Sequence, residues 1–282
     1  MSPRQRLDLH LVALGLAASR QQAQQLIRAG RVRARGQLLD KPGVPVASDL
    51  AVEVQPFAQF VSRGGQKLAA ALAAFPIQVQ GRICLDGGIS TGGFTDCLLQ
   101  NGAARVYGID VGYGQTAWSL RSDPRLVLRE RTNLRHLSAE QLFGPEDPRP
   151  DLAVADVSFI SLALIWPALE RLLAAGDADA VLLVKPQFEV GRQRVGKGGV
   201  VRDPQAHVDA ITGVIAATAQ AGWRASQLLA SPITGPAGNH EYLLWLARRG
   251  EGGSDKAGPL DQPPSTTAIA ALVERTLATG SS

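Results

Sequence analysis

The sequence has few of the residues that build disulfide-linked, metal-binding or membrane-spanning proteins. Only two of its 282 residues are cysteines, Cys84 and Cys97, which is too few for a disulfide framework or a cysteine-rich metal cluster. No run reaches the roughly 20 uninterrupted apolar residues of a membrane helix, and charges interrupt positions 1–20, where a secretory signal would be apolar. We therefore expect a cytoplasmic protein with two core thiols, no metal ion and no membrane association.

Aromatic residues are also scarce, at 5% of the chain, while 45% of the residues are hydrophobic and 19% are charged. This composition is that of an ordinary globular protein and excludes the disordered, collagenous and fibrous classes. At roughly 100–200 residues per domain, the length allows one large domain with a small companion.

The net charge of +4 arises in one region of the chain. Residues 1–56 contain eight basic and four acidic residues, whereas the remainder contains 21 of each sign. The eight basic residues are Arg4, Arg6, Arg20, Arg28, Arg31, Arg33, Arg35 and Lys41. Such a local basic surface predicts a polyanionic partner, and a solvated surface of scattered arginines is the alternative.

The same region has the pattern of a compact module over residues 1–60. Leucines at helical spacing predict a helix that begins near Leu7, and Ser19 is placed to cap a second helix that ends at Gly30. Short apolar runs and turns follow, which predict a small sheet between Val32 and Val54. We expect a small α+β domain.

A strand, a glycine loop and a helix then follow one another, as at the start of a nucleotide-binding unit. The strand covers residues 82–86, the loop 87–93 and the helix 94–101. The next apolar run ends in Asp110, at the distance where an acidic residue meets a ribose diol. The loop does not contain the G-x-G-x-x-G pattern of dehydrogenases, which disfavours a dinucleotide-dependent oxidoreductase. Its leading carboxylate suits S-adenosylmethionine; the alternative is that the glycines only tighten a turn.

Short apolar runs continue along the chain and are separated mostly by helical patterns. They lie at residues 82–86, 105–110, 126–129, 152–156, 180–184, 227–230 and 241–247. This alternation predicts an α/β fold with a mostly parallel, doubly wound sheet over residues 61–250. Residues 251–282 are expected to form a flexible linker, by composition, and a short helix over 268–277.

Four polar residues are placed at strand ends or on the helix that leads into the first strand. They are Lys67, Asp156, Lys185 and Glu241. Each alone is more typical of an ion pair than of a catalyst. In this order and on these elements, they resemble the Lys-Asp-Lys-Glu tetrad of FtsJ-like ribose 2′-O-methyltransferases.

Longer segments resemble the TlyA family, haemolysin-like proteins that join an RNA-binding domain of the ribosomal-protein type to an FtsJ-like domain. RLDLHLVALGLAASRQQAQQLIRAGRVRARGQLLDKPG resembles the RNA-binding domain, and VSRGGQKL, DVSFISL, LLVKPQFEVGR and GNHEYLLW resemble the second domain. The resemblance implies a Rossmann-like, seven-stranded, S-adenosylmethionine-dependent methyltransferase domain. Its implied substrate is a cytidine 2′-hydroxyl of ribosomal RNA or a ribosomal subunit, with no obligate protein partner. The family name also leaves a membrane-active haemolysin as an alternative.

The resemblance also assigns site residues. The cofactor residues are Asp86, Gly88, Ser90, Thr91, Gly92, Gly93, Phe94, Asp110, Asn133 and Asp156. Ile89 stands where the family has alanine, a difference that alters the shape of this pocket.

Methyl transfer to a hydroxyl requires the loss of one proton. Lys185 is the candidate base, because burial beside Lys67 favours a neutral amine. Asp156 and Glu241 oppose that effect, so we assign them to orienting the lysines and the hydroxyl. Phe159, Ser161 and Phe188 are candidates to flank the substrate base, although for Phe159 packing in the core is the favoured prediction.

Overall fold

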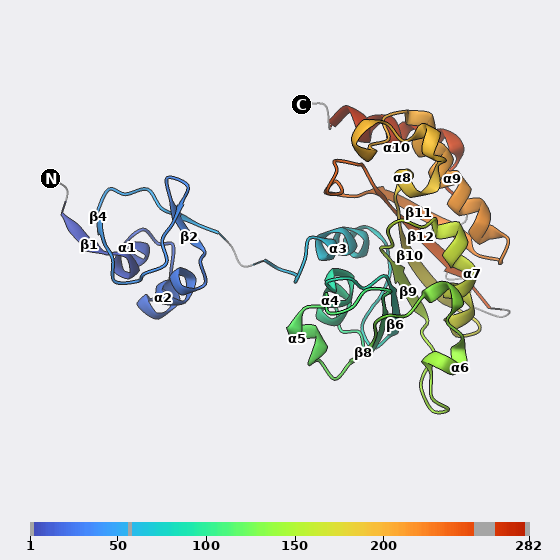
Figure 1. The fold of residues 1–282 in the computed structure, drawn as a ribbon, viewed down its shortest axis with the longest axis horizontal. Coiled ribbons are helices and arrows are strands. Elements are labelled where there is room, and N and C mark those ends of the chain that lie inside the picture. The colour runs from blue at the N-terminus through green and yellow to red at the C-terminus, as the bar shows by residue number, and fades with distance from the viewer. Residues whose placement is uncertain (1–2, 56–57, 251–262, 280–282) are drawn as a thin grey trace. The chain divides into compact units, whose positions relative to one another are not determined.

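The chain divides into two compact units, Met1–Gln59 and Phe60–Ser282 (Figure 1). A computed structural model describes residues 3–55, 58–250 and 263–279. The predicted linker after residue 250 falls on residues 251–262, which lie outside the described residues.

The first unit contains two helices, α1 (Leu7–Ala13) and α2 (Arg20–Arg28). The side chain of Ser19 accepts a hydrogen bond from the Gln22 amide, as its position before α2 predicts. Short strands complete the unit in two small antiparallel sheets, one of β1 and β4 and one ordered β3-β2-β5. The strands are β1 (Arg4–Arg6), β2 (Val32–Ala34), β3 (Gln37–Leu38), β4 (Pro45–Ala47) and β5 (Glu53–Val54).

The pairing of β1 with β4 is not predicted by the sequence pattern. A strand of three residues is too short to show an alternating pattern, and its partner lies about forty residues away in the chain, between Arg4 and Ala47. The segment that follows β3 therefore ends in a strand, β4.

The second unit is built on one seven-stranded sheet with the order β11-β12-β10-β9-β6-β7-β8. Its strands are β6 (Ile83–Gly87), β7 (Arg105–Ile109), β8 (Leu126–Arg129), β9 (Leu152–Ala155), β10 (Ala178–Val184), β11 (Arg224–Ala230) and β12 (Tyr242–Arg248). Each predicted apolar run forms one of these strands. β12 runs antiparallel to both β10 and β11, while the β10, β9, β6, β7 and β8 neighbours are parallel.

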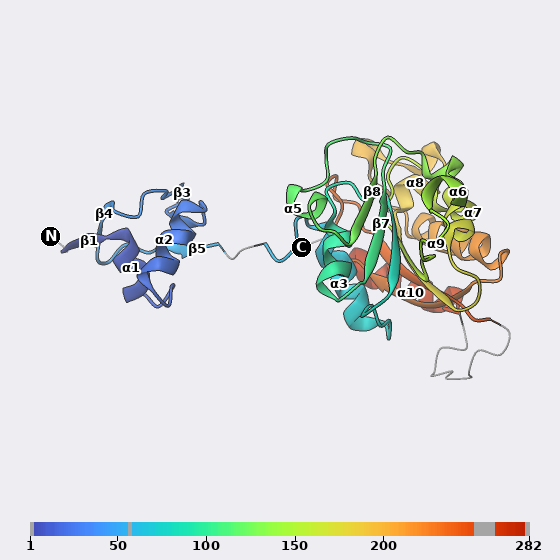
Figure 2. The same ribbon diagram turned by 90° about the horizontal axis from the view of Figure 1, so that it is seen from below.

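Helices cover both faces of this sheet (Figures 1 and 2). α3 (Gly64–Ala74) and α4 (Gly93–Gln100) pack on one face, and α7 (Leu162–Leu172), α9 (Pro204–Ala219) and α10 (Thr266–Thr279) pack on the other. Shorter elements connect the layers: α5 (Trp118–Arg121), α6 (Ala139–Leu142), α8 (Pro186–Glu189), and 3-10 turns at Leu134–His136, Arg192–Arg194 and Lys197–Gly199. None of the described helices is long and apolar enough to cross a membrane.

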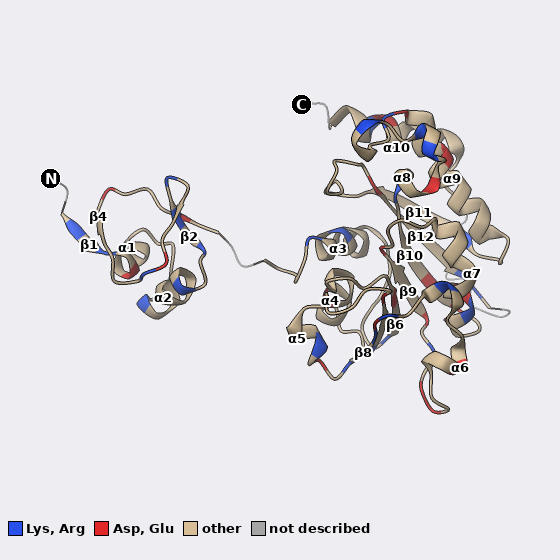
Figure 3. Ribbon diagram, viewed as in Figure 1, with Lys and Arg blue, Asp and Glu red and all other residues tan. Residues whose placement is uncertain are grey.

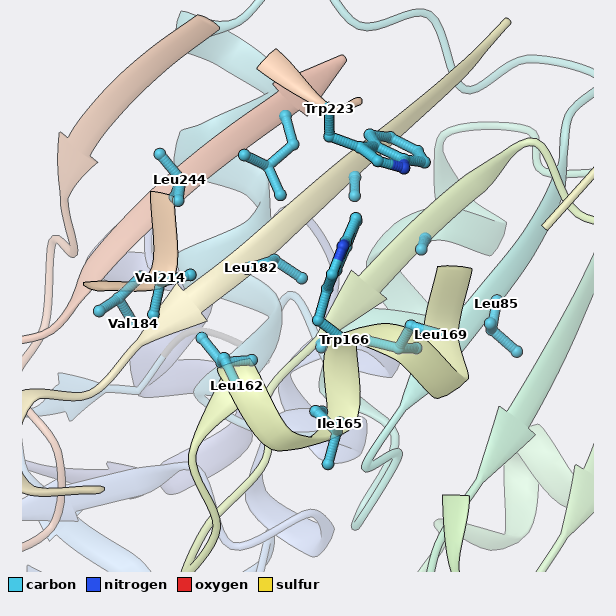
Figure 4. Close-up of a cluster of buried hydrophobic side chains, with 14 of the residues drawn as sticks. Leu85, Leu162, Ile165, Trp166, Leu169, Leu182, Val184, Val214, Trp223 and Leu244 are labelled. Atoms are coloured by element: carbon cyan, nitrogen blue, oxygen red, sulfur yellow. The ribbon is translucent and has the colours of Figure 1, made fainter. Parts of the chain in front are cut away.

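Two tryptophans dominate the core beneath α7 and α9. Trp166 and Trp223 meet edge to face with their ring centroids 5.0 Å apart, beside Leu182 and Leu244 of the sheet (Figure 4). Burying a large apolar side chain contributes roughly 1.5–3 kcal/mol. This packing fixes the central strands on which the carboxyl edge of the sheet depends.

An ion network holds the opposite edge of the sheet. The Arg82 guanidinium donates to Asp151 at 3.0 Å and to Asp179 at 2.7 Å. Asp179 also accepts from the indole nitrogen of Trp245 and from Arg249, each at 3.1 Å. The network thereby joins the beginnings of the parallel strands to the end of β12.

A buried carboxylate organises the first unit. Asp8 on α1 is fully buried and accepts hydrogen bonds from Arg6 at 2.9 Å, Arg20 at 3.0 Å and Gln24 at 2.8 Å. The Arg6 guanidinium beside it, helped by Gln24 and Arg20, holds the pKa of Asp8 well below its usual range. Asp8 thus connects β1, α1 and α2.

Replacing this carboxylate should loosen the first unit. We expect Asp8→Ala to cost about 1.5–3 kcal/mol, because it removes hydrogen bonds made by charged donors. Amide hydrogen exchange in α1 and α2 of the full chain should then accelerate roughly ten- to hundred-fold. Asp8→Asn, which keeps one acceptor oxygen, should have an intermediate effect.

The same contribution should depend on pH. Because folding lowers the pKa of Asp8, its stabilisation is present above about pH 4 and is lost as the pH falls below that value. Unchanged exchange rates in Asp8→Ala would show that the carboxylate does not organise the unit.

Candidate active site

A cavity of about 690 Å³ lies at the carboxyl edge of the sheet, within the size range of small-ligand sites. Its walls come from the beginning of α3, from the loops that follow β6, β7, β8, β9 and β10, and from the residues between β11 and β12. Since β12 is antiparallel to β10, with Tyr242 opposite Val184, the residue that enters β12 lies beside the residue that leaves β10. This register brings Glu241 and Lys185 to the same edge.

The four predicted catalytic side chains all line this cavity and form two ion pairs. Lys67 Nζ lies 2.5 Å from Glu241 Oε2, and Lys185 Nζ lies 2.6 Å from Asp156 Oδ1. The two lysines and Glu241 are buried, while Asp156 is partly exposed. Each buried cation is therefore compensated by a carboxylate, which such burial requires.

The glycine loop is held in shape by the carboxylate at the end of β7. Asp110 accepts hydrogen bonds from the Ser90 and Gly112 amides, each at 2.7 Å. Ser90 has a left-handed φ of +49°, so its bond to Asp110 helps fix an unfavourable backbone conformation. Gly88 has φ +85°, and a Cβ there would lie 3.1 Å from the Asp156 carbonyl oxygen. Only glycine fits this close approach of the loop to the end of β9.

Most of the predicted cofactor residues border the cavity. Those at its wall are Gly88, Ser90, Thr91, Gly93, Phe94, Asp110, Asn133 and Asp156. Asp86 and Gly92 are not among the lining residues. Asp86 and Gly92 are therefore not placed to contact a ligand in the cavity directly.

Asp86 instead lies beneath the loop as a fully buried carboxyl group. One of its oxygens accepts a hydrogen bond from Thr95 at 2.6 Å, and the other has no partner among the described residues. Burial raises the pKa of Asp86 to about 7, and Asp156 and Asp110 add to this rise, while Thr95 opposes it. The spacing of a strand-end carboxylate could not reveal that its side chain turns inward.

Three contacts of Lys185 and its neighbours were not predicted. Lys185 Nζ also donates to Ser158 Oγ at 2.9 Å. On α8, Glu189 accepts from the Ser161 hydroxyl at 2.6 Å and from the Leu162 amide at 2.8 Å. Glu189 therefore ties the loop after β10 to the loop after β9, the two segments that carry Lys185 and Asp156.

The prediction that Phe159 packs in the core is wrong. Its side chain is 91% exposed at the cavity wall, its φ is +66°, and its ring centroid lies 5.2 Å from that of Phe188. The sequence does not predict this exposure of Phe159. Burial is predicted from the alternation of apolar residues, and a residue with a left-handed backbone breaks that alternation.

The buried side-chain amide of Asn239 connects residues 191–201, a glycine-rich segment that follows α8, to the entry of β12. Asn239 accepts from the Val201 amide at 3.0 Å and donates to the Gly199 carbonyl at 2.8 Å. Nearby, His207 bonds the Tyr242 hydroxyl and the Val201 carbonyl, and burial lowers its pKa. These bonds place the segment beside Glu241.

The predicted RNA-binding residues of the first unit differ in their contacts. Arg6 and Arg20 are bonded to Asp8, and Arg33 donates to the Gly36 carbonyl at 3.1 Å. Arg4, Arg28, Arg35 and Lys41 are exposed, and Arg31 is half-buried. The basic segments lie on β1, α2 and β2 (Figure 3).

The buried carboxyl group of Asp86 gives a test of the electrostatics beneath the loop. Its folded-state pKa of about 7 exceeds the unfolded value of about 3.9, so the folded chain holds more protons between these values. Stability should therefore fall as the pH rises from 4 to 7, and Asp86→Asn should remove this part of the fall. All four tryptophans lie in the second unit, so fluorescence-monitored urea unfolding reports on it. An identical pH slope in both proteins would contradict the assignment.

Comparison with known proteins matches both units. The family model of FtsJ-like methyltransferases matches residues 60–248, and the S4 domain model matches residues 5–52. A solved structure from Streptococcus thermophilus that carries a hemolysin name is 37% identical, with a TM-score of 0.70 over 99% of this chain and 98% of that one.

Two curated relatives have names that state an activity. The 16S/23S rRNA (cytidine-2′-O)-methyltransferase TlyA of Mycobacterium tuberculosis is 53% identical over 87% of this chain and 91% of that protein. The 23S rRNA (cytidine-2′-O)-methyltransferase TlyA of Campylobacter jejuni is 37% identical over 67% of this chain and 71% of that protein. The two-unit architecture, the site and these similarities together show that this chain belongs to the FtsJ-like methyltransferases and, among them, to the TlyA family.

Proposed function

We propose that this chain transfers a methyl group from S-adenosylmethionine to the ribose 2′-hydroxyl of a cytidine in ribosomal RNA. The observation that carries the proposal is the pair of lysine–carboxylate contacts, Lys67–Glu241 and Lys185–Asp156, in the cavity that the glycine loop borders. Both curated relatives described above carry this activity in their names. One name cites 16S and 23S ribosomal RNA and the other cites 23S ribosomal RNA alone, so the proposal specifies cytidine in ribosomal RNA and does not choose between the two RNAs.

The residues of the cavity fit S-adenosylmethionine. The cofactor supplies a methyl group on a sulfonium centre. Asp110 would hold the ribose hydroxyls, Asn133 and Leu134 would border the adenine, and Asp156 with the Gly88 backbone would face the methionine end. The cavity thus combines carboxylates for the polar groups with an apolar wall at Ile109 and Leu134.

The chemistry requires the chain to hold two reactants and accept one proton. When bound, the cofactor would supply the methyl group as its carbon–sulfur bond breaks, and Lys185, in its deprotonated form, would accept the proton that the ribose hydroxyl gives up. Positioning of this kind can supply about 7–11 kcal/mol of the barrier reduction. Asp156 and Ser158 orient Lys185 Nζ, and Glu241 orients Lys67, which lines the same cavity.

Phe159, which is exposed at the cavity wall, and the half-buried Phe188 beside it suit a nucleotide base. Phe159 lies on the loop that carries Asp156, and Phe188 lies on α8, directly after Lys185. A base that stacks on an aromatic ring gains roughly 1–3 kcal/mol in single-stranded recognition. We assign this pair to the target base, and the basic residues of the first unit to the surrounding RNA backbone.

The alternatives weighed from the sequence receive no comparable support. A dinucleotide-dependent oxidoreductase is disfavoured because the matching family model describes methyltransferases. One relative carries a hemolysin name, but nothing in the part of the chain that the structure describes favours membrane insertion over methyl transfer.

Replacing Lys185 tests the chemical step. Lys185→Ala should lower single-turnover methylation of ribosomal RNA by about 10²- to 10⁴-fold, with cofactor and RNA affinities within a few-fold of wild type. Lys185→Arg should not restore the rate, because arginine keeps the charge but does not release its proton. Near-normal turnover by Lys185→Arg would remove the base assignment and leave positioning as the source of catalysis. No 2′-O-methyl difference between ribosomal RNA from cells with and without the gene would refute the proposed function itself.

Replacing Asp110 tests the cofactor site. Asp110→Ala should weaken binding of S-adenosylhomocysteine roughly ten- to hundred-fold, because the carboxylate both shapes the loop and faces the ligand. Glu130→Gln is a matched control, since Glu130 also accepts a loop amide hydrogen bond, from Gly114, but does not line the cavity. Calorimetric titration with equal affinities for Asp110→Ala and the control would exclude Asp110 from the site.

A further inference from the structure

A second hollow, of about 440 Å³, adjoins the cofactor cavity at the β8 edge of the sheet. We call it the arginine hollow. Its lining residues are Arg129, Arg131, Thr132, Asn133, His136, Leu137 and Gln141. Thr132 and Asn133 line the main cavity as well, so the two depressions share a wall.

The arginine hollow has basic and neutral polar groups but no carboxylate in its lining. Arg129, Arg131 and His136 are all exposed. No ion pair among the described residues engages either guanidinium, and the intervening Glu130 is directed to Arg121 and to the Gly114 amide instead. The guanidinium groups of Arg129 and Arg131 therefore retain their hydrogen-bond donors.

Arg131 is held in place without the use of those donors. Its guanidinium carbon lies 4.1 Å from the centre of the Tyr113 ring, and its amide donates to the Gly112 carbonyl at 3.0 Å. Tyr113 is itself 65% exposed. A guanidinium stacked on an aromatic face keeps its planar fork of N–H groups free for a phosphate.

This surface departs from the charge balance of the rest of the second unit. Outside residues 1–56 the chain has equal numbers of basic and acidic residues, and the two signs are interspersed over the second unit (Figure 3). A concave patch lined by two arginines that have no ion pair among the described residues is therefore a local excess of positive charge, and His136 adds a polar ring to it. Phosphate groups are the ligands that this donor set complements.

We propose that the arginine hollow binds backbone phosphates of the RNA beside the target nucleotide. The inference rests on the proposed function, and it adds an RNA contact on the catalytic unit to those expected on the first unit. Its position next to the cofactor cavity would hold the RNA strand near the site of methyl transfer, while Arg129 and Arg131 remain outside the main cavity.

The test is the double variant Arg129→Ala with Arg131→Ala in the full chain. The control is Arg224→Ala with Arg275→Ala, two exposed arginines at the start of β11 and on α10, away from the β8 edge. The probe is ribosomal RNA from cells that lack the gene, with binding measured between 50 and 200 mM salt. Tryptophan fluorescence unfolding verifies that both variants are folded.

We expect the hollow variant to bind RNA about ten- to hundred-fold more weakly than the control, with a salt slope reduced by about one to two. Its affinity for S-adenosylhomocysteine should stay within about twofold of wild type, because neither arginine lines the cofactor cavity. Tyr113→Ala should produce a smaller loss of RNA affinity, since it removes only the stacking partner of Arg131.

Equal RNA affinity and equal salt slope in the hollow and control variants would overturn the inference. Binding of inorganic phosphate that is lost in the hollow variant, without any change in RNA binding, would identify a free-anion site and also overturn it. Failure of the wild-type chain to methylate any ribosomal RNA would instead refute the proposed function. Methylation by wild type with an unaffected hollow variant would refute only the RNA contact.

Discussion

The reversed direction of β12 is the constraint on which the site depends. In a fully parallel sheet the residue that enters a strand lies at the edge opposite the chemistry, whereas Glu241 enters β12 beside the end of β10. Lys67 can then meet Glu241 while Lys185 meets Asp156. Two cations are thereby buried with two anions, and the cavity can hold reactive groups without an uncompensated charge.

The sequence predicts those parts of the fold and site that follow from local pattern. The seven strands appear as apolar runs. Three of the four catalytic candidates stand at their ends, where α/β sheets collect functional groups, and Lys67 stands on the helix that leads into the first strand. The missed features depend on contacts between distant segments. Glu189 reaches Ser161, Asn239 reaches Gly199, and β1 finds β4 only in the folded chain. The outward ring of Phe159 follows from a left-handed backbone that its residue type does not signal.

The arginines of the first unit illustrate a second limit of sequence reasoning. Counting charges treats all eight basic residues alike, but Arg6 and Arg20 share the buried Asp8, while Arg28 and Lys41 are exposed and have no ion pair among the described residues. A guanidinium can maintain the fold with one N–H and still present others to a ligand. Two arginines of the basic surface are therefore held in place by the buried Asp8. A net-charge count treats Asp8 only as a negative charge that reduces the positive total.

The network around Arg82 separates the mechanical support of the sheet from its chemistry. Asp151, Asp179, Trp245 and Arg249 meet this guanidinium or one another at the edge away from the cavity. Loops at the carboxyl edge can consequently change length and sequence, because the network at the opposite edge keeps the strands aligned. Substitutions that change substrate preference at the carboxyl edge therefore need not reduce the stability of the sheet. Substitutions at the opposite edge would disturb the Arg82 network and do not have this tolerance.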